Sequence, residues 1–159
     1  MNDEPADHRR ETEAERLDRN FDELLQELRV SQTGVQILFA FLLGVSFTQS
    51  FRQADSFVHI VYSVTLLLCA LATALFIGPV ALHRMLFGLG SKGELVKVSS
   101  RLALGGLYAL LLAITGAVLL ALDDPLGRPI ALTLAGGAFV VLVGLWVVLP
   151  ARLRAQRLT

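Results

Sequence analysis

The sequence predicts an all-α fold: an integral membrane four-helix bundle with a cytoplasmic amphipathic helix at its N-terminal end. Three observations predict it. First, 54% of the 159 residues are hydrophobic and the mean hydropathy is +0.61, above the level of ordinary soluble domains. Second, Asp, Glu, Lys and Arg are absent from residues 30–51, 56–82, 102–122 and 129–151. Third, nearly all basic residues fall on one side of the resulting topology.

Each uncharged stretch is long enough to cross a bilayer once. A helix needs about 20 apolar residues to cross a hydrocarbon core of about 30 Å. We therefore predict a membrane domain at residues 30–151 with spans at about 30–51, 56–78, 102–122 and 129–150. A membrane β-barrel needs strands of about 10 alternating residues, and these longer, uniformly apolar runs do not show that pattern.

The region before the first span is hydrophilic. Residues 1–8 are polar and contain Pro5, which predicts a disordered tail. Residues 9–29 predict a cytoplasmic amphipathic helix, because apolar residues recur there at spacings of 4, 3 and 4. These residues are Leu17, Phe21, Leu24 and Leu28. The same rhythm continues into the first span, which indicates one long helix.

The amphipathic helix has two interpretations: it lies on the membrane surface, or it contacts a protein. The acidic residues of the N-terminal region outnumber its arginines by two to one, so anionic headgroups would repel it. The composition therefore favours a cytoplasmic protein contact through residues 9–29.

Proline and glycine mark the predicted breaks between spans. Gly78-Pro79 predicts that the second helix kinks or ends there, because proline removes one helix hydrogen bond. Residues 123–129, DDPLGRP, predict a tight external turn, with Pro129 in the first turn of the last helix.

The basic residues predict the orientation. Twelve of the 14 precede the first span, lie between the second and third spans, or follow the fourth in a basic tail at residues 152–159. Only Arg52 and Arg128 lie on the opposite side. By the positive-inside rule, both termini and the middle loop are cytoplasmic. We therefore expect a multi-pass protein of the cytoplasmic (inner) membrane.

Small residues recur at helical spacing in the last three spans. They are Gly105, Ala109, Ala113 and Ala117 in the third span, Ala70, Ala74 and Gly78 in the second, and Gly136 and Gly144 in the fourth. Lipid gives helices no hydrophobic drive to associate, so close approach along small-residue faces holds bundles together. We interpret these faces as packing seams of the bundle or of a homo-oligomer, with a smooth substrate channel as the alternative.

A polar stripe at the cytoplasmic end of the first span holds the candidate functional residues. Its members are Glu27, Arg29, Gln32, Thr33 and Gln36. Gln36 lies about 10 Å beyond Arg29, inside the hydrocarbon, where its amide needs a partner. We favour hydrogen bonds between helices. A polar ring lining an oligomeric pore and a bound lipid or small ligand are the alternatives.

Signatures of catalysis are absent from the sequence. There is no H-E-x-x-H, G-x-S-x-G, C-x-x-C or P-loop pattern, no set of residues at metal-ligand spacing, and no cofactor motif. No surface of interleaved basic and aromatic residues indicates nucleic-acid binding. We expect a non-enzymatic, self-associating protein whose partners are the lipid bilayer and its own copies. The alternative is an ion channel or small-solute transporter with a pathway along the polar face of the first span.

Three segments carry a family resemblance. FDELLQELRVSQTGVQILFAFLL (21–43), VYSVTLLLCALATALFIGPVALHRMLF (61–87) and GELVKVSSRLAL (93–104) resemble an actinobacterial family of small four-helix membrane proteins built on a domain of unknown function. The resemblance implies the topology and an inner-membrane location. Some members carry a sodium:proton antiporter label. All acidic residues here lie outside the four spans, which disfavours proton antiport through an intramembrane carboxylate.

Overall fold

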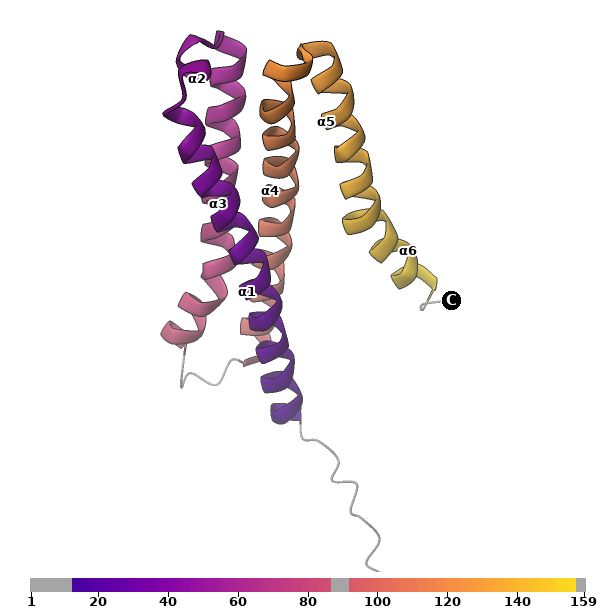
Figure 1. Cartoon of the computed structure of the whole chain (residues 1–159). Helices are drawn as coiled ribbons and strands as arrows, with labels where there is room; N and C mark the ends of the chain where they lie inside the picture. Colours follow the sequence, from indigo (N-terminus) through magenta and orange to yellow (C-terminus); the bar gives the residue numbers. More distant parts are fainter. Residues whose placement is uncertain (1–12, 87–91, 157–159) are drawn as a thin grey trace, which may run out of the picture.

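The computed structural model describes residues 13–86 and 92–156, and these residues are almost entirely helical (Figure 1). The elements are α1 (Glu13–Ser46), α2 (Gln49–Gln53), α3 (Ser56–Leu86), α4 (Lys92–Leu126), α5 (Arg128–Val143), a π-helical segment (Gly144–Val148) and α6 (Leu149–Gln156). Four stretches of the described residues are long and apolar enough to cross a membrane. The all-α class and the four apolar helices are thus confirmed. The predicted tail at residues 1–8 lies outside the described residues.

α1 joins the amphipathic stretch and the first apolar stretch into one helix, in agreement with the apolar spacing that the two stretches share. It ends at Ser46, five residues before the predicted limit of the first span. The last turn tightens there, because the Phe47 N–H donates to the Gly44 carbonyl at 3.2 Å and the Thr48 N–H to the Val45 carbonyl at 3.0 Å. Thr48 then starts α2, since its Oγ1 accepts from the Phe51 N–H at 3.2 Å.

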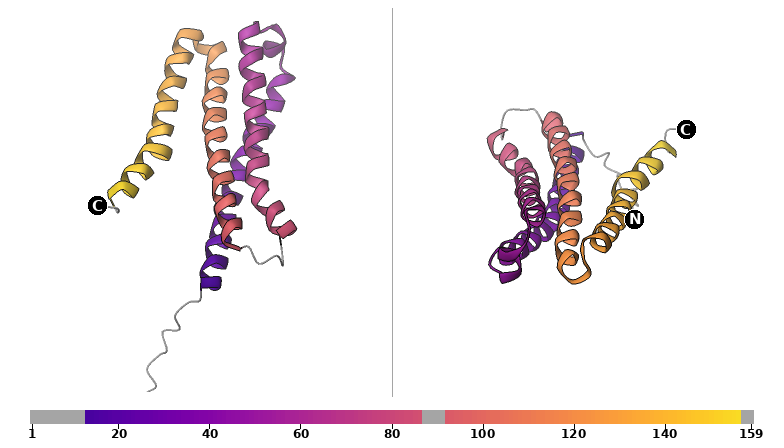
Figure 2. Two further views of the ribbon diagram at one scale, coloured as in Figure 1. Left: turned by 180° about the vertical axis from the view of Figure 1, so that it is seen from behind. Right: turned by 90° about the horizontal axis from the view of Figure 1, so that it is seen from above.

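α3 continues beyond Gly78-Pro79, the point where the second span was predicted to end. Pro79 lies inside the helix, which runs to Leu86. The proline is fully buried, so packing holds the helix through the position where one backbone hydrogen bond is missing. Past this point the end of α3 leans away from α4 in both side views (Figures 1 and 2).

The turn between α4 and α5 is much shorter than the external turn predicted from the sequence. α4 continues through Pro125 to Leu126, and Gly127 alone separates it from α5. Gly127 has a φ of +78°, a conformation that glycine adopts without a steric penalty. Its N–H donates to the Asp123 carbonyl at 3.1 Å. Pro129 lies in the first turn of α5, as predicted.

α1, α3 and α4 pack around a common apolar core. Its most buried members are Val35 and Leu42 of α1, Cys69, Ala72 and Phe76 of α3, and Ala113 of α4. α3 and α4 are in tight contact where glycines of α4 face bulkier residues of α3. A Cβ on Gly106 would lie 2.5 Å from the Phe76 ring, and one on Gly116 would clash with Thr65. Glycine is therefore what permits this spacing.

α5 packs chiefly against α4 and diverges from the other helices along its length (Figure 2). Ala131 and Ala135, in its first two turns, are its buried residues. In the most apolar 18-residue window of Arg128–Gln156, 6% of the residues are buried, against 33% for Glu94–Leu126. Most of the fourth apolar helix is therefore not covered by other parts of the described chain.

Candidate functional site

The polar stripe predicted on the first span lies on the outer surface of α1. Glu27, Arg29, Thr33 and Gln36 are exposed and Gln32 is half-buried. The Thr33 hydroxyl donates to the Arg29 carbonyl of its own helix at 3.0 Å. The stripe therefore borders the bundle instead of lining its interior.

The interior between α1, α3 and α4 is apolar where the chain is described. Two polar side chains are buried in this part of the chain, Thr65 and Ser99. The Thr65 hydroxyl donates to the Val61 carbonyl at 2.7 Å, and the Ser99 Oγ has no hydrogen-bond partner. Apolar side chains fill the remaining core. The described core of one chain therefore has no row of polar side chains that could line a hydrophilic pathway.

The predicted packing residues divide into two groups. In α4, Ala109, Ala113 and Ala117 are buried, and a Cβ on Gly105 would lie in ordinary contact, 3.4 Å from the Leu75 Cδ1. These four residues lie in contacts within the chain.

The remaining small residues lie mostly outward. Ala70, Ala74 and Gly136 are exposed, and a Cβ at Gly136 or at the half-buried Gly144 would meet nothing within 4 Å. Gly78 is half-buried, with the Leu102 Cδ1 2.9 Å from the position of a Cβ. Apart from Gly78, these positions do not serve close packing within the described chain.

The apolar stripe of the amphipathic helix is covered by the chain itself. Phe21 and Leu28 are buried, and the Phe21 ring stacks on the His83 imidazole of α3 with 5.0 Å between ring centroids. Leu24 is half-buried against the same core. The side chain of Leu17 lies outside the described set. A cytoplasmic partner would therefore meet the charged side of this helix.

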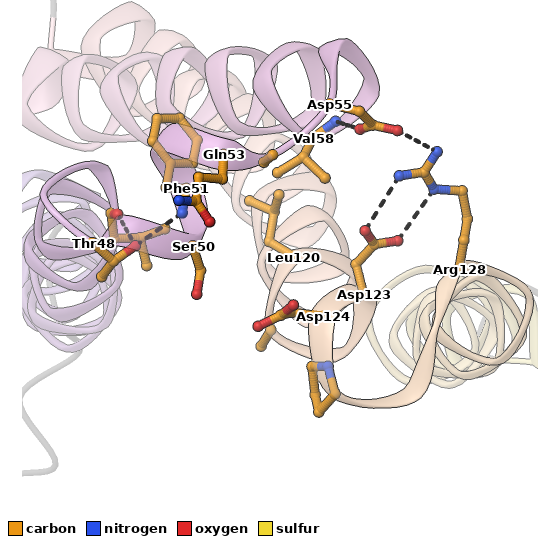
Figure 3. A pocket seen from close by; sticks show the side chains of 14 residues that line it. Thr48, Ser50, Phe51, Gln53, Asp55, Val58, Leu120, Asp123, Asp124 and Arg128 are labelled. Carbon is orange, nitrogen blue, oxygen red and sulfur yellow. Dashed lines mark hydrogen bonds and ion pairs between the residues drawn. The ribbon is translucent and has the colours of Figure 1, made fainter.

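A charged cluster joins the ends of three helices at the opposite end of the bundle (Figure 3). The Arg128 guanidinium lies between two carboxylates. Its NH1 is 2.8 Å from Asp55 Oδ2, while its Nε and NH2 donate to the two Asp123 oxygens at 3.3 Å. The guanidinium also lies 4.3 Å from the centre of the Phe57 ring. One arginine thus connects the start of α3, the end of α4 and the start of α5.

Local structure positions Asp55 for this contact. Its Oδ1 accepts from the Val58 N–H at 3.1 Å and so caps the start of α3, which leaves Oδ2 for Arg128. The hydrogen bond from Arg128, followed by that from Val58, holds the pKa of Asp55 below its ordinary value. The carboxylate therefore stays ionised at neutral pH.

A cavity of about 570 Å³ opens beside the cluster, between α2 and the ends of α3 and α4. Thr48, Ser50, Gln53 and Asp124 contribute polar groups to its wall (Figure 3). Asp55 and Asp123 are both paired with Arg128, so the cluster is a structural link between helices. Among the described residues, no group of three or more His, Cys, Asp or Glu side chains could hold a metal ion.

Sequence reasoning missed the pairing of Asp55 with Arg128. These residues are far apart in the chain, and neither belongs to a motif. The available signal was topological: both lie in short connections predicted on the same side of the membrane, so opposite charges there meet at one surface.

A family model matches residues 10–150, and its description is a family of unknown function, DUF6328. The match covers most of the chain and confirms the resemblance to a domain of unknown function. No curated protein and no solved structure matches the chain.

Proposed function

Because the chain belongs to the DUF6328 family of unknown function, its role must be inferred from its own residues, and we propose that it is a non-enzymatic multi-pass protein of the cytoplasmic membrane that associates with itself in the bilayer plane. Four apolar helices support a multi-pass membrane protein. The excess of basic residues at the termini and the middle loop supports a cytoplasmic location for these parts.

One observation carries the proposal: several of the features that the sequence marks as interactive face outward from an apolar core. Gln36, Ala70 and Ala74 are all exposed, whereas apolar side chains fill most of the described core. Helices in lipid associate through small residues and interhelical hydrogen bonds. Groups of this kind on the outer surface are suited to contacts with neighbouring helices in the same bilayer.

The test of self-association is the oligomeric state of the full chain in lipid. Copies labelled with donor or acceptor fluorophores are reconstituted into liposomes at decreasing protein-to-lipid ratios. We expect energy transfer that falls with dilution in the manner of a reversible equilibrium. Transfer no greater than random proximity predicts, at every ratio, would overturn the proposal.

Transport is the second candidate function, and the outward position of the polar stripe restricts it. A pathway past Gln32 and Gln36 would run between copies, because these side chains do not line the core of one chain. The proposal expects ion flux through reconstituted liposomes no higher than through empty vesicles. A flux that Gln36→Leu abolishes would favour the transporter instead.

The orientation has its own test. Cysteine substitutions at Arg152 and at Gln53 report which end of the bundle faces the cytoplasm, and Cys69 is buried in the wild-type background. An impermeant thiol reagent added to whole cells should label the variant at position 53 and spare the variant at position 152. The opposite pattern would reverse the topology.

A further inference from the structure

Seven serine and threonine hydroxyls in the apolar helices are satisfied within their own helices, whereas the buried Ser99 Oγ has no partner among the described residues. These seven hydroxyls donate to backbone carbonyls three or four residues earlier, at 2.7–3.0 Å. They belong to Thr33, Ser46, Ser63, Thr65, Thr73, Thr115 and Thr133. Gln36 differs, because no hydrogen bond joins its amide to another residue in the described part of the chain. An exposed amide without a partner therefore lies on α1.

The depth of Gln36 follows from its place in the helix, given the membrane insertion that the proposed function assumes. It lies six residues after Val30, where the uncharged stretch begins, and ten before the end of α1 at Ser46. At about 1.5 Å per residue these distances are about 9 Å and 15 Å. A glutamine side chain, shorter than the lysine and arginine chains that reach headgroups, does not cover such a distance. Lipid tails offer the amide no hydrogen-bond partner.

Small residues continue along the same face of α1. Thr33, Gln36, Ala40 and Gly44 follow spacings of 3, 4 and 4, and all four are exposed. A Cβ on Gly44 would meet nothing within 4 Å. We call these four residues the Gln36 face. Its small residues allow a second helix backbone to approach closely enough for short amide side chains to meet.

We propose that the Gln36 face is the contact between two copies of this chain, with their Gln36 amides hydrogen-bonded to each other. Copies inserted with the same topology present their α1 helices in parallel. A twofold axis along the membrane normal then brings identical residues opposite each other at equal depth. A primary amide has both a donor and an acceptor, so it complements its own copy, which a lone donor cannot do.

Arg29 lies near this face at the cytoplasmic edge, where two copies bring like charges together. It precedes the uncharged stretch, so headgroups and water surround it and salt screens the repulsion. The small residues Ala40 and Gly44 lie toward the opposite end. If the two α1 helices pack most closely at Ala40 and Gly44, they separate toward their Arg29 ends.

Cysteine cross-linking in the membrane locates the contact. Ala40→Cys and Gly44→Cys test the Gln36 face, and Gly137→Cys on α5 is the matched control, because Gly137 is equally exposed. The wild-type chain reports any background from the buried Cys69. Under mild oxidation we expect covalent dimers from the two α1 variants and background levels from the control. Dimers from Gly137→Cys alone would overturn the assignment.

The amide itself is tested by the dimer equilibrium in liposomes. Gln36→Leu should weaken association about 3- to 30-fold, the range of interhelical hydrogen bonds in membranes. Gln36→Asn keeps the amide and should recover part of the loss. Ile37→Leu is the lipid-facing control and should have no effect. Melting temperatures of the variants show whether each one folds.

Tyr108 provides the competing pair, because it is an exposed hydrogen-bonding side chain of α4 at a similar depth. Tyr108→Phe should leave the equilibrium unchanged. A loss equal to that of Gln36→Leu would assign the contact to α1 against α4 and overturn the α1 pairing. If the wild type associates and Gln36→Leu does not weaken it, this inference fails alone. If the wild type does not associate, the proposed function fails with it.

Discussion

Helix α4 packs against both α3 and α5, and these two contacts differ sharply. Against α3 it packs so closely that Gly106 and Gly116 leave no room for a Cβ beside Phe76 and Thr65. Against α5 it packs near the turn at Gly127, and the rest of α5 leans away from it (Figure 2). α5 has glycines too, but a Cβ at Gly137 would meet nothing within 4 Å. The same residue type is thus a packing requirement in one contact and not in the other.

The membrane insertion proposed above would make both arrangements compatible with one chain. Acyl chains cover an apolar helix face as well as a neighbouring helix does, so bare leucine and valine side chains on α5 carry no penalty in a bilayer. An exposed amide has no such substitute, because lipid tails cannot hydrogen-bond. The bare surface of α5 therefore needs no protein partner, whereas Gln36 on α1 needs one.

Gly106→Ala should have the largest effect on stability. The new methyl group would lie 2.5 Å from Phe76 Cε1 and 2.7 Å from its Cδ1. The ring is 1% exposed, so other parts of the protein surround it and would have to shift if it turned. We expect a loss of about 1–3 kcal/mol in the free energy of unfolding, typical of an overpacked core. Unfolding by sodium dodecyl sulfate in mixed micelles, followed by circular dichroism, measures it.

An unchanged unfolding free energy for Gly106→Ala would contradict the close α3–α4 contact. Gly105→Ala is the matched control on the adjacent position. Its Cβ would lie 3.4 Å from the Leu75 Cδ1, an ordinary contact distance, so it should cost much less.

The sequence predicts four apolar helices well, but it does not predict which side of each helix faces the core. In a water-soluble protein, the buried face of a helix is more hydrophobic than its solvated face. The periodic spacing of apolar residues in the sequence therefore shows which face is buried. Inside a bilayer both faces are apolar, so this signal weakens. The four-residue spacing marks Ala109 and Ala113, which are buried, and equally marks Ala70 and Ala74, which are exposed.

The polar stripe shows a second reason for the gap. The sequence identifies Gln36 as an amide that needs a partner, and it leaves the partner open. Only the arrangement of the other helices shows that this partner is not in the described part of the same chain. The pairing of Asp55 with Arg128 was likewise hidden, because it depends on two connections meeting at one end of the bundle.

Arg128 forms a polar link between the closely packed helices and α5, and its contribution should depend on pH. The pKa of Asp55 is lowered in the folded state by the hydrogen bond from Arg128. The stabilisation is therefore fully present above the unfolded pKa of about 3.9 and is lost as the pH falls through the lower folded pKa. We expect the melting temperature to fall with pH below about 4.

Arg128→Gln should reduce this acid dependence, because the folded and unfolded pKa values of Asp55 then move closer together. At neutral pH it should lower the melting temperature by less than Gly106→Ala does, since the side chains of Arg128 and Asp55 are 38% and 53% exposed. Asp124→Asn is the control, because Asp124 lines the cavity without joining the ion pair. If the melting temperatures of wild type and Arg128→Gln depend equally on acid pH, the ion pair of Arg128 with Asp55 does not cause this dependence.

Gly137→Ala should have the smallest effect, and its sign completes the comparison with Gly106. A methyl group at Gly137 meets open space, while alanine favours the helix over glycine by about 0.5–1 kcal/mol. The free energy of unfolding should therefore stay unchanged or rise by up to this amount, in the same micelle assay. A loss comparable to that of Gly106→Ala would mean that another surface packs against this glycine. A protein surface, and not lipid alone, would then cover α5. The contact between copies would have to include α5.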